Sequence, residues 1–87
     1  MELKPIYLDN NATTRVYPAV VEAMLPFFTE HFGNASSIHA FGSEVGKALK
    51  KARGQVQALL GAEHDSEIIF TSCGTESDST AILSALK

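Results

Sequence analysis

One short segment combines residue types that could bind a phosphate group. Residues 70–77 read Phe-Thr-Ser-Cys-Gly-Thr-Glu-Ser, a β-prone end followed by a turn of small residues and the start of a helix. The first turn of a helix leaves backbone N–H groups unpaired and carries a partial positive charge. Gly74 would let an anion approach the backbone closely, and the hydroxyls of Ser72 and Thr75 could add donors. The segment therefore predicts a phosphate site centred on Gly74 and Thr75.

The same residues also fit an ordinary helix start. Within residues 75–78, Thr75 could serve as an N-cap, and the acidic Glu76 and Asp78 would favour the positive helix end. These carboxylates would repel a phosphate if they pointed towards it. A cap and a phosphate can coexist, because a helix end has several free donors. A Walker-type nucleotide loop is excluded, since no glycine–lysine pair ends the turn.

Other side chains with chemical potential favour structural roles. Cys73 is expected to be a small residue packed between strand and helix, although its place at a helix start could lower its pKa. His31, His39 and His64 are too scattered to predict a metal site, and His39 is given a local structural role. The basic cluster of the central helix is expected to form a solvated face, and its members are Lys47, Lys50, Lys51 and Arg53.

The elements around the phosphate-site segment follow from hydrophobic spacing. The β-branched and aromatic run Glu67–Thr71 predicts a buried strand, and the helix after it shows no stop signal before the chain ends. The preceding apolar residues repeat every three or four positions, which predicts an amphipathic helix that ends at Gly61. These apolar positions are Phe41, Val45, Ala48, Leu49, Ala52, Val56, Leu59 and Leu60.

The N-terminal half contains weaker signals. Ile6–Leu8 is a β-prone run that ends at an Asp-Asn-Asn turn. A helix is expected to begin near Pro18 and to kink or end at Pro26. Residues 32–37 predict a turn with a serine placed to cap the next helix.

Composition limits the class of protein. With 45% hydrophobic and 20% charged residues, the 87-residue chain is not a disordered tail. A net charge of −3 argues against a nucleic-acid partner, and no apolar run is long enough for a membrane span. A single cysteine without a signal peptide favours a cytoplasmic protein. A strand flanked by helices indicates an α/β layer, and its unclosed last helix predicts a piece of a longer chain.

Three motifs resemble the cysteine desulfurase family, most closely its nitrogen-fixation branch. They occur in the family's order and spacing, and the resemblance covers essentially the whole chain. One departure is Ala35, where the family usually has proline. The motifs are Tyr7–Thr14 (YLDNNATT), Phe32–His39 (FGNASSIH) and Phe70–Ser77 (FTSCGTES).

This resemblance implies an α/β fold of the class-V aminotransferase-like, fold-type I kind, with the cofactor pyridoxal 5'-phosphate. Residues 1–16 would be an N-terminal segment of the small domain near the active site, through Asn11–Thr13. Residues 17–87 would hold helices and the first strand–helix unit leading into the cofactor-binding large domain, whose sheet starts here. Gly74 and Thr75 would bind the cofactor phosphate. No catalytic residue or metal ligand is expected within residues 1–87.

The resemblance also implies a reaction. A homodimeric enzyme would convert L-cysteine to L-alanine and keep the sulfur as an enzyme persulfide. An iron–sulfur scaffold protein would then accept the sulfur, in nitrogenase maturation. The residues leave open a stand-alone phosphate-binding module or an interaction segment, and the scaffold leaves open a related lyase such as a selenocysteine lyase.

Overall fold

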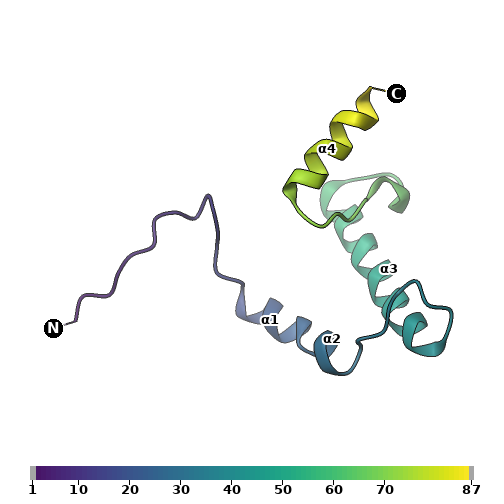
Figure 1. The fold of residues 1–87 in the computed structure, drawn as a ribbon, viewed down its shortest axis with the longest axis horizontal. Coiled ribbons are helices and arrows are strands. Elements are labelled where there is room, and N and C mark those ends of the chain that lie inside the picture. The colour runs from purple at the N-terminus through teal and green to yellow at the C-terminus, as the bar shows by residue number, and fades with distance from the viewer. Residues whose placement is uncertain (1, 87) are drawn as a thin grey trace. The chain divides into compact units, whose positions relative to one another are not determined.

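The computed structural model describes residues 2–86, which form helices and connecting segments (Figure 1). The chain divides into two compact units, one ending at Val45 and the other beginning at Gly46, so that the boundary falls inside the longest helix. The elements are α1 (Pro18–Met24), α2 (Pro26–Thr29), α3 (Ala40–Leu60), the short 3₁₀ helix η1 (Asp65–Glu67) and α4 (Gly74–Ala85).

The two short helices of the first unit are separated by a proline, as predicted. Pro18 occupies the start of α1, where its missing N–H has no helical partner to lose. The α1 helix closes with a hydrogen bond of 3.1 Å from Leu25 N–H to Val21 O. Pro26 has no N–H with which to continue the ladder, so a new helix, α2, starts there and contacts α1. The expected break at Pro26 is confirmed.

A turn precedes α3, as predicted, but no serine caps the helix. Asn34 accepts hydrogen bonds of 2.9 Å from Ser36 N–H, at its side chain, and from Ser37 N–H, at its carbonyl. The helix starts later, because Ser43 N–H donates to the carbonyl of His39 at 3.0 Å. His39 therefore stands at the cap position. The Asn34 side chain stabilises the turn itself, and this places the serines too early in the chain to cap α3.

The helix α3 ends as its sequence predicts. Gly61 has φ +71°, a left-handed conformation that costs glycine little. Ala62 N–H donates to Gln57 O at 3.0 Å, and Gly61 N–H donates to Ala58 O at 3.4 Å. These two bonds satisfy carbonyls that would otherwise lack partners at the helix end, in the pattern of a Schellman motif.

The predicted strand Glu67–Thr71 is absent from the described residues. Glu67 belongs to η1, and Ile68 is extended, with φ −98° and ψ 120°. Residues 69–71 follow without regular structure, and Ile6–Leu8 likewise form no strand. The β-branched run does favour extended backbone, but a strand also needs a neighbouring strand to pair with its N–H and C=O groups. Residues 2–86 provide no such neighbour, so the expected sheet is not formed within them.

Few apolar side chains are removed from water. Among hydrophobic residues in the described range, Ile68 alone is buried, at 8% exposure. The accessible surface is 8134 Å², whereas a folded monomer of 9.3 kDa should expose roughly 5000 Å². No helix in residues 2–86 has the length and apolar character to cross a membrane.

Candidate functional site: the start of helix α4

The N-terminus of α4 carries the predicted phosphate-binding residues. Cys73 is the N-cap, with extended backbone at φ −169° and ψ 171°, and Ser77 N–H donates to its carbonyl at 3.1 Å. No side chain makes a capping hydrogen bond to this helix start. The first-turn amides, which include those of Gly74 and Thr75, therefore keep the donor capacity that an anion requires.

Gly74 faces open space. A Cβ built on this residue would meet nothing within 4 Å, so packing against the described residues 2–86 does not explain a glycine here. A glycine at the first helical position also lowers helix propensity relative to alanine. Close approach of a group from outside the described residues would account for both observations.

Glu76 interacts with the residue before the cap rather than with the free amides. Its carboxylate accepts a hydrogen bond from Ser72 N–H at 3.1 Å and another from the Ser72 hydroxyl. These bonds lower the pKa of Glu76, the Ser72 hydroxyl having the larger effect and the Ser72 amide the smaller one. Two expectations are thereby wrong: Thr75 lies inside the helix and is not its cap, and the Ser72 hydroxyl is not free for a phosphate.

Thr71 stabilises the turn into α4. Its hydroxyl donates to the Cys73 carbonyl at 3.2 Å and contacts the Ser77 hydroxyl across the helix start. The Cys73 carbonyl thus accepts both a helical bond from Ser77 and a side-chain bond from Thr71. These contacts fix the direction in which the chain enters α4.

Cys73 is exposed, which corrects the expectation that it packs between strand and helix. Without a sheet in the described residues, no surface covers it. The backbone amide of Glu76, then the Ser72 hydroxyl and the Thr75 amide, lower the pKa of the Cys73 thiol. The Ser72 hydroxyl lies 3.7 Å from the sulfur. The direction of this pKa shift is the one expected if the amides at the helix start stabilise a negative charge.

The residues at the start of α4 fit a phosphate, although nothing encloses it within the described chain. A hollow of about 240 Å³ lies along α4 and another of about 260 Å³ lies in the first unit, but neither is lined by Gly74 or Thr75. No three His, Cys, Asp or Glu side chains gather in residues 2–86 as a metal ion would require. The first-turn amides without a side-chain cap are donors of the kind that anion binding requires.

The remaining predicted positions lie elsewhere. Asn11–Thr13 belongs to the first unit, in a turn where Ala12 N–H donates to Asp9 O at 3.0 Å. Thr13 also bonds to the Tyr7 hydroxyl at 2.5 Å. The proximity of this stretch to an active site stays a prediction. His39 packs edge-on against Phe41, with ring centroids 6.1 Å apart, which fits a local role.

Arg53 departs from the solvated helix face to which the sequence assigned it. Lys47, Lys50 and Lys51 are exposed, whereas Arg53 is half-buried. Its guanidinium donates to the carbonyl of Ile68 and lies 4.8 Å from the centre of the Phe70 ring. The sequence carries no local signal for these contacts, because the partners lie fifteen and seventeen residues away along the chain.

The chain is similar in sequence to several known cysteine desulfurases. The chain is 79% identical over 82 residues to the cysteine desulfurase NifS of Azotobacter vinelandii, covering 94% of this chain and 20% of that protein. It is 73% identical over 85 residues to a cysteine desulfurase of Gluconacetobacter diazotrophicus, covering 98% of this chain and 21% of the relative. A cysteine desulfurase of Rhodobacter capsulatus is 68% identical over 81 residues, with coverages of 93% and 21%.

The chain thus spans about a fifth of the length of these curated relatives. No solved structure matches it significantly. Residues 6–87 match the aminotransferase class-V family, and this range includes both the turn at Asn11 and the start of α4. The sequence motifs and the comparison therefore agree, and the chain belongs to the aminotransferase class-V family.

Proposed function

We propose that this chain supplies the phosphate-binding helix start of a pyridoxal-phosphate-dependent cysteine desulfurase. The enzyme would convert L-cysteine to L-alanine and retain the sulfur as an enzyme persulfide for iron–sulfur cluster assembly in nitrogenase maturation. The observation that carries the proposal is the helix start without a side-chain cap at Gly74, in a chain 79% identical to a protein named as a cysteine desulfurase.

The residues at the start of α4 would hold the phosphate. The amides of Gly74 and Thr75 would donate to it, the helix dipole would favour its charge, and the Thr75 hydroxyl could add a donor. Pyridoxal phosphate, when bound, supplies an electron sink for the substrate, while the protein provides its orientation. The role of this chain is to bind and orient; we assign no catalytic residue to residues 1–87.

The wider organisation is part of the proposal. A class-V aminotransferase domain implies the fold-type I architecture, in which residues 1–16 would lie near the active site and residues 17–87 would lead into the large-domain sheet. A neighbouring strand from that sheet would pair with residues 67–71, which lack a partner here. We further propose a cytoplasmic homodimer that passes sulfur to an iron–sulfur scaffold protein.

A charge placed at Gly74 tests the phosphate site. In the full-length enzyme, Gly74→Asp should lower the affinity of the apoenzyme for pyridoxal phosphate at least about tenfold, because like charges would meet. The measurement is titration of the apoenzyme, followed by the visible absorbance of the bound cofactor and by alanine release from L-cysteine.

Ser79→Asp is the matched control. It adds the same charge to an exposed position of the same helix, beyond the first turn, and should leave the affinity nearly unchanged. Normal cofactor binding by Gly74→Asp would contradict the proposed site. Equal losses in both variants would indicate an unspecific effect of charge and would also contradict it.

A further inference from the structure

The side chain of Arg53 connects helix α3 to the segment that leads into α4. Its guanidinium donates a hydrogen bond to the Ile68 carbonyl and lies over the face of Phe70 at 4.8 Å from the ring centre. A hydrogen bond from a charged guanidinium to a carbonyl is stronger than one from a neutral donor. The positive charge is also attracted to the face of the aromatic ring. Arg53 is half-buried, so water competes for these contacts less than at the exposed lysines.

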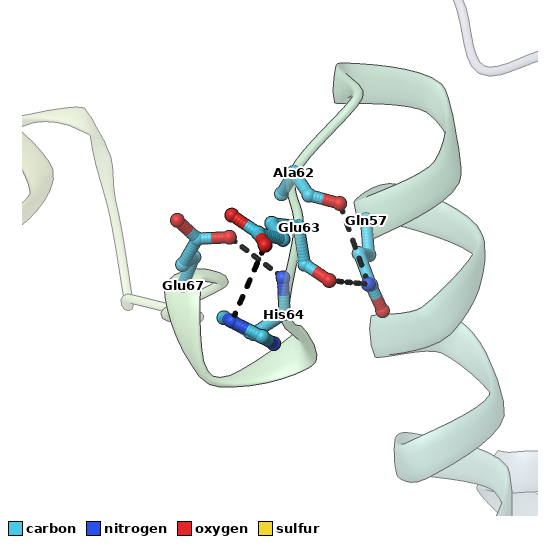
Figure 2. A network of polar contacts seen from close by, with 5 residues as sticks. All are labelled: Gln57, Ala62, Glu63, His64 and Glu67. Carbon is cyan, nitrogen blue, oxygen red and sulfur yellow. Dashed lines mark hydrogen bonds and ion pairs between the residues drawn. The ribbon is translucent and has the colours of Figure 1, made fainter.

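No direct packing joins α3 to α4 within the described residues. The position of the α4 start relative to α3 therefore depends on the connecting segment, residues 61–73, and on the side chains that hold it. Gln57 binds the beginning of this segment, donating to the carbonyls of Ala62 at 3.4 Å and Glu63 at 3.2 Å (Figure 2). Arg53 lies one helical turn earlier in α3 and holds its later part.

The middle of the connecting segment is also fixed from within. The Glu67 side chain accepts a bond of 2.7 Å from His64 N–H, which caps the start of η1 (Figure 2). Ile68, held by Arg53 through its carbonyl, is the buried hydrophobic residue of the described chain. Only Ile69 and Phe70 separate it from Thr71, whose hydroxyl binds Cys73 and Ser77 at the start of α4. Arg53 thus holds one end of the short segment 68–71, and Thr71 holds its other end to the turn that precedes Gly74.

We propose that Arg53 is a positioning residue for the phosphate site: it fixes residues 68–70 so that the amides of Gly74 and Thr75 face the cofactor phosphate. The inference rests on the proposed function and adds to it a residue outside the site. In this proposal Arg53 acts on binding only through the Gly74 and Thr75 amides, which donate to the phosphate. The effect of Arg53 on affinity should therefore appear only for a ligand that carries a phosphate.

The test compares two ligands in the full-length apoenzyme. Arg53→Met keeps much of the side-chain length and removes the charge and donors, and Arg53→Lys keeps the charge but loses the planar fork. For Arg53→Met we expect the affinity for pyridoxal phosphate to fall about tenfold, with the affinity for pyridoxal, which lacks the phosphate, nearly unchanged. Arg53→Lys should recover part of the loss. Lys51→Met, an exposed neighbour on α3, is the control.

A second readout follows the site without any ligand. Hydrogen exchange of the apoenzyme should become faster in residues 68–76 of Arg53→Met, because opening this segment no longer costs the free energy of breaking the Arg53 contacts. In Lys51→Met, exchange of the same residues should stay unchanged. A variant that merely lowers stability would weaken binding of both ligands equally and speed exchange throughout the protein. Either result would overturn the inference.

The two proposals fail in different ways. The phosphate site itself is refuted if the wild-type enzyme binds pyridoxal as tightly as pyridoxal phosphate. It is also refuted if the wild type prefers pyridoxal phosphate and Gly74→Asp keeps the same preference. If wild type prefers the phosphate form, Gly74→Asp loses this preference and Arg53→Met keeps it, then the site stands and the role of Arg53 is refuted.

Discussion

Single residues around the start of α4 determine which groups remain free to bind an anion. The Glu76 carboxylate could have occupied the first-turn amides, yet it binds Ser72 instead. The negative charge is therefore placed before the N-cap, and Cys73, the cap residue itself, makes no capping bond. Because the amides keep their donor capacity, the physical argument for a phosphate at Gly74 survives the presence of an acidic residue in the first turn.

The exposed thiol of Cys73 provides a test of this local field. The Glu76 amide and the Ser72 hydroxyl lower its pKa, so the thiolate should form at a lower pH than in an ordinary cysteine. The alkylation rate of Cys73 in the apoenzyme, measured by mass spectrometry of its peptide against pH, should therefore reach half its maximum below the value for a free cysteine peptide.

Two changes should shift this alkylation profile to higher pH. Ser72→Ala removes one donor to the thiolate, though the larger effect of the Glu76 amide remains. If pyridoxal phosphate binds at the proposed site next to Cys73, it should slow alkylation by its charge and bulk. A half-maximal pH at or above the ordinary value, or a rate unaffected by the cofactor, would contradict this view of the helix start.

At the scale of elements, Gly61, just after the end of α3, and Gly54, inside the helix, play different parts. Gly61 ends the helix at φ +71°, where any side chain would be strained, although a Cβ would meet nothing within 4 Å. Gly54 lies inside the helix, also with open space around its Cβ position. The two positions thus differ in backbone conformation and not in crowding.

Alanine at these two positions should have opposite effects on stability. Gly61→Ala should destabilise the protein by about 1 kcal/mol through the left-handed conformation. Gly54→Ala should stabilise it by about 0.5–1 kcal/mol, because alanine loses less backbone entropy in a helix. Chemical unfolding of the full-length apoenzyme measures both, and a destabilising Gly54→Ala would show that another part of the protein approaches this position.

At the scale of the whole molecule, the described residues 2–86 bury few hydrophobic side chains fully. Ile68 alone is buried among the hydrophobic residues of the described range, and side chains such as Phe28, Phe32 and Leu59 are largely exposed. The hydrophobic effect is the main favourable term in folding, and it scales with the apolar area removed from water. A surface of 8134 Å² leaves that term small.

The isolated 87-residue polypeptide should therefore not unfold cooperatively. Thermal scans by circular dichroism should show a gradual loss of helix, and a dye that binds exposed apolar surface should fluoresce in its presence. The proposed longer enzyme, in which other segments would cover the same side chains, serves as the comparison. A sharp transition in the isolated chain would instead favour a stand-alone module.

The sequence predicted the elements whose signals are local. Pro26 breaks a helix because it lacks an N–H, and Gly61 ends one because it tolerates positive φ. The helix start near Gly74 follows from the same short-range logic. Such features depend on hydrogen bonds between residues at most five apart, so their residues and spacing suffice to identify them.

The tertiary structure decided what depends on distant partners. The run Glu67–Thr71 has the composition of a strand, but no neighbouring strand pairs with it in residues 2–86, and Cys73 is exposed for the same reason. Arg53 resembles the neighbouring lysines in sequence, yet it alone of that cluster bonds to Ile68. A one-dimensional pattern records propensity and not the identity of the contacting group, because contacts across many residues are fixed only when the chain has folded.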